Sequence, residues 1–398
     1  MDPGGANLTK EVLTEVTNIN KFIEVMEYHV PFAIGINKCM TPVLYLVGAI
    51  GNIVSARIWL HPRMKACNIS ANYLAALAIA DFTYLLLHVF YELENPWLVG
   101  TLDIPVWCEL WNVLYMAVQY LCVLLVFAFT TERFLSVCHP FKSERFSRKT
   151  RSTKVIFLLT VIALFFGLPQ AYFWEVADTE CFVRFSERVA DDSFYSIYTW
   201  ASEMAMFGVV PLFVLSLNLC VLLKIKTVGN LNIKDSRRSQ VRYNLVTTTI
   251  TLLWVSFYLI VTTLPVTITF AIQNNIVLGP PMPISKMGDN SVWRSYFNYY
   301  TARVVIREIC MSHHVCNIFI YCATSRRFLK HFKELLLGPL VCPIKNDESS
   351  TRQYPTPLLK NKHLIKEQNS RSSSNSQAIV IAELPKMFVE THETTLNG

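Results

Sequence analysis

Six separate stretches of this chain run for 20 residues or more with at most one formal charge each. A helix needs about 20 mostly apolar residues to cross the roughly 30 Å hydrocarbon core of a bilayer. Only 16% of the residues are charged, whereas soluble domains carry about a quarter. This composition excludes a disordered chain, a collagen-like fibre and a nucleic-acid-binding protein. We therefore predict an all-α membrane protein with spans at 39–60, 69–91, 110–131, 155–174, 204–223 and 245–272.

A seventh span is predicted at about 297–323, although Arg303, Arg307 and Glu308 lie in its first half. Charged residues in membrane helices usually face the interior of a bundle or a water-filled cavity. The alternative is that these charges mark the membrane boundary. We favour the span, which makes the chain a seven-transmembrane helix bundle.

The positions of Lys and Arg predict the orientation of the bundle. Basic residues concentrate in the loops after spans one, three and five, whereas the alternate loops are acidic or mixed and include Glu92, Glu94 and Asp103. Because basic loops stay in the cytoplasm, segment 1–38 is predicted to be extracellular and the C-terminus cytoplasmic. The sequon at Asn7 is then a candidate glycosylation site.

Short motifs occur in order along these spans, and their spacing matches that of a known family of membrane proteins. They are Gly51-Asn52, Leu77 to Asp81, the pair Cys108 and Cys181, Glu132-Arg133-Phe134, Pro211, Pro265 and Asn317 to Tyr321. With these motifs the chain resembles a rhodopsin-like (class A) G-protein-coupled receptor over about residues 39–342. The run from Glu132 to Pro140 also resembles invertebrate neuropeptide receptors of the FMRFamide-like and thyrotropin-releasing-hormone-like group. The resemblance implies a receptor in the plasma membrane, surrounded by lipid bilayer.

The resemblance also divides the chain into segments. Residues 1–38 form the extracellular N-terminal segment, 39–324 the bundle, 325–342 a short amphipathic eighth helix and 343–398 a disordered cytoplasmic tail. Cys342 is a candidate for palmitoylation, and an unmodified thiol is the alternative. The serine-rich tail is expected to recruit arrestin and kinases.

The family motifs imply two roles for named residues. Cys108 and Cys181 are expected to form a disulfide on the oxidising side of the membrane, the alternative being two free buried thiols. Glu132, Arg133 and Tyr321 are expected to couple the receptor to a heterotrimeric G protein. The alternative for Arg133 is a boundary arginine that reaches to the lipid headgroups.

The ligand pocket is expected among the outer halves of helices two, three, five, six and seven. The candidates by helical position are His88, Tyr91, Tyr115, Gln119, Glu203, Arg303, Arg307 and Glu308. Any of them could be an ordinary packing residue. The long third outer segment, about 273–296, and the acidic outer loops favour a peptide ligand.

Asp81 is the lone acid deep in the second span. In the family this aspartate joins Asn52 and polar groups such as Asn317 to hold a sodium ion in the inactive state. Here His313 stands where an asparagine is usual, and Cys122 replaces a hydroxyl. We expect an Asp81–His313 contact in place of sodium, with a simple helix-packing histidine as the alternative.

Several other functions are less well supported. A light receptor needs a lysine in the middle of the seventh span, and 309–323 contains none. A transporter needs charged or broken helices at midplane across several spans. A receptor for an amine or a lipid, or a constitutively active orphan receptor, remains the alternative to a peptide receptor. We expect no enzymatic activity, cofactor or metal site.

Overall fold

The computed structural model describes residues 19–338 except 68–69, 95–96, 139–148, 178–179, 185–192 and 230–235. The predicted sites at Asn7 and Cys342 and the predicted tail 343–398 therefore lie outside the described residues.

Long helices form the bundle. They are α3 (Pro31–Leu60), α5 (Ala71–Glu94), α6 (Trp107–Cys138), α8 (Lys149–Gly167), α11 (Phe194–Glu203) continued by the π-helical turn η1 (Met204–Val209) and α12 (Val210–Gly229), α13 (Ser236–Ile272) and α15 (Ser291–Thr324). Among the described residues, six segments are long and apolar enough to cross a membrane: Pro31–Leu60, Ala71–Glu94, Trp107–Cys138, Arg151–Phe173, Phe194–Ile225 and Thr249–Ile272. The predicted seventh span lies in α15, a single helix of 34 residues that is more polar than the other six. The helix bundle is thus confirmed.

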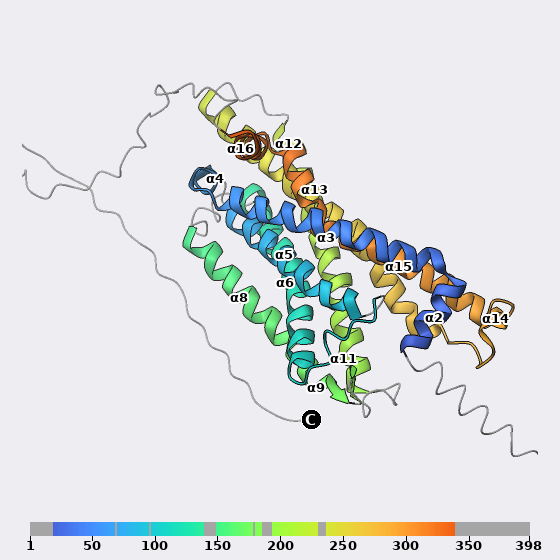
Figure 1. Ribbon diagram of the computed structural model, residues 1–398. Helices are drawn as coiled ribbons and strands as arrows, with labels where there is room; N and C mark the ends of the chain where they lie inside the picture. The colour runs from blue at the N-terminus through green and yellow to red at the C-terminus, as the bar shows by residue number, and fades with distance from the viewer. Residues whose placement is uncertain are drawn as a thin grey trace, which may run out of the picture. The chain divides into compact units, whose positions relative to one another are not determined.

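The helices α3, α5, α6, α12, α13 and α15 pack one against the next in a closed ring, and α8 packs against α6. Helix α3 packs against α5 and α15, α6 against α5, α8 and α12, and α13 against α12 and α15 (Figure 1). The interior is filled by fully buried side chains such as Leu74, Leu125 and Phe129. By contrast, Phe157 and Phe165 of α8 are 71% and 69% exposed. Exposed apolar side chains around the sides of the bundle suit a protein surrounded by lipid hydrocarbon. In that environment the backbone polar groups must be paired within the helices.

The end of the bundle that is predicted to be extracellular, called the outer end below, carries smaller elements. The short helix α9 (Gln170–Phe173) leads into an antiparallel hairpin of β1 (Trp174–Ala177) and β2 (Glu180–Val183), in which Val176 pairs with Cys181. Helix α2 (Ile19–His29) packs on α14 (Ile284–Met287) and the start of α15 through a cluster that includes Met26, Met287 and Trp293. A 3-10 turn, η2 (Gln273–Asn275), follows α13.

Several helices extend beyond the predicted spans. Helix α3 already begins at Pro31, within the segment predicted to be an outer tail, because proline is well tolerated in the first helical turn. Helix α15 begins at Ser291, where the Asn290 side chain accepts hydrogen bonds from the backbone of Val292 and Trp293. Hydropathy detects only the part of a helix that lies in hydrocarbon, so polar helical extensions escape it.

The opposite end, predicted to be cytoplasmic and called the inner end below, carries α4 (Pro62–Cys67) and α16 (Arg326–Leu337). The Ser325 side chain caps α16 by accepting a hydrogen bond from the Phe328 backbone. Phe328 is fully buried against the rings of Trp59 and Tyr321. The identity of α16 with the eighth helix of the resemblance stays a prediction. Helix α15 continues unbroken through Ile318.

Candidate functional site

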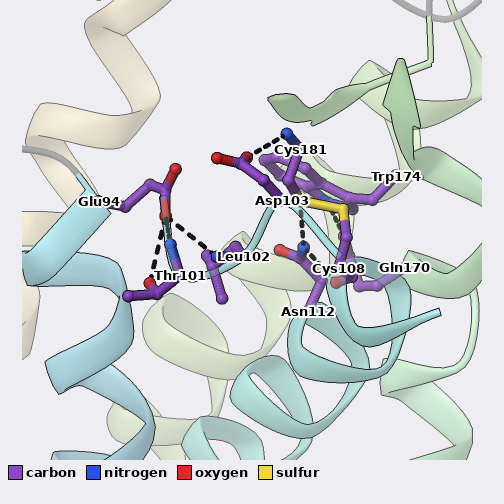
Figure 2. Close-up of a disulfide and its surroundings, with 9 residues drawn as sticks. All are labelled: Glu94, Thr101, Leu102, Asp103, Cys108, Asn112, Gln170, Trp174 and Cys181. Atoms are coloured by element: carbon purple, nitrogen blue, oxygen red, sulfur yellow. Dashed lines mark hydrogen bonds between the residues drawn. A yellow bond between two sulfur atoms is a disulfide. The ribbon is translucent and has the colours of Figure 1, made fainter. Parts of the chain in front are cut away.

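A disulfide fixes the hairpin at the outer end of α6. Cys108 of α6 and Cys181 of β2 are bonded, with their Cα atoms 5.8 Å apart, as predicted (Figure 2). Asp103 Oδ1 accepts a hydrogen bond from the Cys181 backbone at 2.9 Å, and Asn112 Nδ2 donates one to the Cys108 carbonyl at 2.9 Å. The β1–β2 hairpin is therefore held to α6 by a covalent bond and to the first outer loop by a hydrogen bond.

The first outer loop is itself ordered by Glu94. Its Oε2 accepts hydrogen bonds from the backbone of Thr101 at 2.8 Å and of Leu102 at 3.1 Å, and from the Thr101 hydroxyl at 3.2 Å (Figure 2). Because one carboxylate oxygen accepts three hydrogen bonds, it fixes Thr101 and Leu102 of the loop between α5 and α6 to the end of α5. This loop and the hairpin together form part of the outer surface of the bundle.

Arg307 of α15 lies at the centre of a polar cluster with α3 and α5. Its Nη2 donates a hydrogen bond to Asn37 Oδ1 at 3.0 Å, and its Nη1 donates to the Tyr91 hydroxyl at 3.2 Å. The guanidinium carbon also lies 5.5 Å from the centre of the Tyr91 ring, within the range of a cation–π interaction. The hydrogen bonds recorded for this cation therefore go to neutral partners.

Two carboxylates lie within electrostatic reach of Arg307 without an ion pair to it in the described part of the chain. Glu92 of α5 is only 2% exposed, and no described residue donates a hydrogen bond to either of its oxygens. Glu308 Oε1 accepts one hydrogen bond from Thr41 at 3.0 Å, and its Oε2 has no partner among the described residues. An unpaired buried charge costs several kcal/mol. The cluster thus suits a bound group that supplies the missing partners.

Aromatic side chains surround this cluster. Tyr115 stacks on Trp111 with ring centroids 4.6 Å apart and on Tyr84 at 5.6 Å. His88 is buried, and its Nδ1 lies 2.6 Å from the Tyr45 hydroxyl. The predicted residues His88, Tyr91, Tyr115, Arg307 and Glu308 are therefore brought together by α5, α6 and α15.

The other predicted ligand residues are more scattered. Glu203, at the end of α11, lies within electrostatic reach of Tyr120 and Tyr115, and Arg307 also acts on Tyr115. A π-helical turn follows directly after Glu203, a feature that often occurs at functional sites. Gln119 is half-buried on α6, and Arg303 is exposed on α15. Arg303 is thus not part of the buried cluster.

The polar core around Asp81 differs from the prediction in one residue. The hydrogen-bonding partner of Asp81 is His314 and not the expected His313: His314 Nδ1 lies 2.7 Å from Asp81 Oδ1, while His313 stays within electrostatic reach of Asp81. His313 Nδ1 instead faces the Cys310 carbonyl. Asn317 Nδ2 donates to Asp81 Oδ2 at 2.8 Å, and Asn52 Nδ2 donates to the His314 carbonyl at 2.7 Å. Adjacent residues of a helix differ by about 100° in direction, so the rotation of α15 about its own axis decides which histidine faces Asp81.

At the inner end, Arg133 is buried and its Nε donates a hydrogen bond to Ser70 Oγ at 3.0 Å. The neighbouring Glu132 interacts electrostatically with Arg133 and Arg151. The Tyr321 ring is fully buried, and no described residue bonds to its hydroxyl.

Comparison with known families decides the class of protein. The profile of the 7 transmembrane receptor (rhodopsin family) matches residues 51–321 of this chain. The chain belongs to the rhodopsin family of seven-transmembrane receptors. It is therefore a multi-pass membrane protein of a family of receptors, not of enzymes.

Individual relatives of the receptor match over shorter regions. The pyrokinin-1 receptor of Drosophila melanogaster is 29% identical over 32% of this chain and 30% of its own length. The neurotensin receptor type 1 of Rattus norvegicus is 28% identical over 32% of this chain and 31% of its own length. The human lysophosphatidic acid receptor 4 is 25% identical over 48% of this chain and 50% of its own length. The receptor thus matches only about a third to a half of the length of these relatives.

Sequence reasoning missed four residues in and around the polar cluster of Arg307. Glu92 was counted as an acid of an outer loop, because it stands at the end of an apolar stretch, yet it is buried. Asn37, Thr41 and Tyr45 belong to α3, a helix that the ligand prediction did not include. The polar positions of α3 that face the charged residues of α15 are the signal that could have revealed them.

Proposed function

We propose that the protein is a cell-surface receptor that binds an extracellular peptide within the outer part of the bundle. Binding activates a heterotrimeric G protein through the inner ends of α6, α12 and α13. Two matched relatives, the pyrokinin and neurotensin receptors, are neuropeptide receptors, which supports a peptide ligand. Their matches cover less than a third of their own length, so the physical argument rests on this chain's own pocket.

The incomplete pairing of Arg307, Glu92 and Glu308 is the observation that carries the proposal. The cluster presents one cation and two carboxylates, all short of hydrogen-bond partners among the described residues. A peptide can bring a basic side chain to Glu92 and a carbonyl or carboxylate oxygen to Arg307 in the same molecule. Such a ligand would form one ion pair or hydrogen bond with Glu92 and another with Arg307. Because these pairs would be buried, the receptor would discriminate against ligands that lack either partner.

A lipid ligand is the second candidate, because the lysophosphatidic acid receptor matches the longest part of the chain among the relatives named above. A lipid phosphate carries negative charge and is best bound by several cations. The cluster offers one half-buried arginine beside two acids, which disfavours a phosphate headgroup. An amine ligand would need an acid at Tyr115 of α6, and none stands there.

We expect Glu92→Gln to lower the potency of peptides that carry a basic residue, while peptides without one keep their potency. The reason is that the neutral amide can no longer pair with a buried cation, a loss of about 2–5 kcal/mol where the pair is desolvated. Cells that express the receptor would be tested with a panel of amidated neuropeptides, with calcium and cyclic AMP as readouts. Arg307→Gln should affect peptides with a free carboxylate in the same way.

The matched control is Glu24→Gln, which removes an exposed acid of the outer helix α2. It should leave every potency unchanged at equal surface expression. If every active peptide has the same potency on the unmodified receptor as on the Glu92→Gln and Arg307→Gln variants, the ligand does not touch this cluster. If lysophospholipids activate the receptor and no peptide does, the peptide proposal is wrong.

Other parts of the function stay predictions from the sequence. They are the extracellular N-terminus, the plasma-membrane location, the narrower neuropeptide subfamily and the binding of arrestin and kinases to the tail.

A further inference from the structure

Three potential metal ligands lie close together in the interior of the bundle. They belong neither to the polar cluster around Arg307 nor to the residues expected to couple to the G protein. Asp81 of α5, Cys122 of α6 and His314 of α15 are buried, and one donor atom from each lies within 4.8 Å of the other two. The three residues come from three helices that are far apart in the sequence. This is why no local motif predicted the cluster and why the sequence alone indicated no metal site.

The surroundings hold these side chains in place. The His314 ring stacks on Tyr84 with centroids 4.1 Å apart and lies 3.8 Å from the ring of His313. Its Nδ1 faces Asp81 Oδ1, and the second carboxylate oxygen accepts a hydrogen bond from Asn317 Nδ2. Metal ligands whose orientation is fixed by outer hydrogen bonds and packing bind more tightly than mobile ones.

The sodium ion of the family does not fit this set of donors. Sodium is a hard ion that binds oxygen atoms, whereas His314 places an imidazole nitrogen directly against the carboxylate and Cys122 adds sulfur. Nitrogen, sulfur and one carboxylate oxygen are instead the donors typical of zinc. The disagreement with the family's ion therefore points to a different metal.

We propose that Asp81, Cys122 and His314 form a binding site for a zinc ion, with water at the fourth position. Around a tetrahedral zinc with bonds of about 2.0–2.3 Å, donor atoms lie roughly 3.3–3.8 Å apart. To reach this spacing, Asp81 Oδ1 and His314 Nδ1 would move apart from their present separation of 2.7 Å by small side-chain rotations.

Proton and charge balance also fit zinc. The Cys122 thiol must release its proton, and a neutral His314 must carry its ring proton on Nε2 so that Nδ1 can bind. A thiolate and a carboxylate then neutralise the two charges of the ion, which limits the cost of burying it. The bound ion would connect α5, α6 and α15, whatever ligand occupies the outer pocket.

The test uses the purified full-length receptor in detergent after removal of metals with a chelator. Cobalt(II), a spectroscopic substitute for zinc, should produce the absorption of a thiolate-to-cobalt charge transfer, and zinc should abolish it. Zinc at about 100 times its Kd should also raise the Tm by about 5 °C, because it binds only the folded state. Sodium and magnesium should not reproduce the zinc effect.

Matched variants locate the ion. Cys122→Ser should remove the cobalt absorption and His314→Ser should weaken binding at least tenfold, whereas Cys310→Ser, which removes a thiol of α15 outside the cluster, should change neither. The cobalt spectrum of the unmodified protein decides the question even if a variant does not fold. Absence of that absorption, its survival in Cys122→Ser, or a Tm that rises with sodium and not with zinc would overturn the proposal.

Discussion

Replacing Arg133 by alanine is expected to abolish G-protein activation while surface expression and ligand binding stay at the level of the unmodified receptor. Arg133 lies at the inner end of α6, about 27 Å along the helix from Tyr115 in the outer pocket, at 1.5 Å per residue. Its loss therefore leaves the ligand cluster intact. Binding of a labelled agonist and G-protein nucleotide exchange, measured in the same membranes, separate the two effects.

The recorded hydrogen bond from Arg133 to Ser70 supplies the control. If this bond favours the inactive arrangement, Ser70→Ala should raise basal signalling, because the arginine is released more easily. A net loss of about 1 kcal/mol would raise the active population roughly fivefold where that population is small. Normal activation by Arg133→Ala at equal surface density, together with unchanged basal signalling in Ser70→Ala, would assign Arg133 a merely structural role.

Hydropathy predicted the bundle well because the bilayer imposes a single length and polarity on each span. It was weakest at α15, where Arg303, Arg307 and Glu308 lower the mean hydropathy of a helix that is nevertheless continuous. Inside a bundle these charges face other side chains instead of lipid. A linear average over the sequence cannot distinguish those two surroundings.

The candidate site was only partly predictable for a related reason. Which residue of a helix faces the interior depends on its rotation, and the choice between His313 and His314 required the structure. Glu92 shows the same limit, since its burial depends on α3 and α15, which lie far from it in the sequence. The motif residues Asn52, Asp81 and Asn317 were found because their family spacing already contains this information.

Loss of the Cys108–Cys181 disulfide at the outer end should reduce ligand binding about as strongly as loss of Arg133 reduces G-protein activation. We expect Cys108→Ser and Cys181→Ser each to reduce ligand binding sharply, and the double variant to be no worse than either single variant. The bond closes a segment with a sequence separation of 73 residues, for which loop-closure entropy predicts a stabilisation of about 4 kcal/mol. Breaking it frees the β1–β2 hairpin from α6, so the outer surface loses its defined shape. Saturation binding and the Tm of each purified variant measure the two consequences.

The equality of single and double variants is the decisive feature of this experiment. Removal of either sulfur breaks the same bond, so the two losses cannot add. Cys39→Ser, which changes an exposed free thiol near the outer end of α3, controls for the substitution itself and should leave binding and Tm unchanged. Asp103→Ala removes the hydrogen bond to the Cys181 backbone and should cost only about 1 kcal/mol, because the covalent bond still holds the hairpin. Losses that add in the double variant would mean that each cysteine acts separately and that the covalent bond does not shape the pocket.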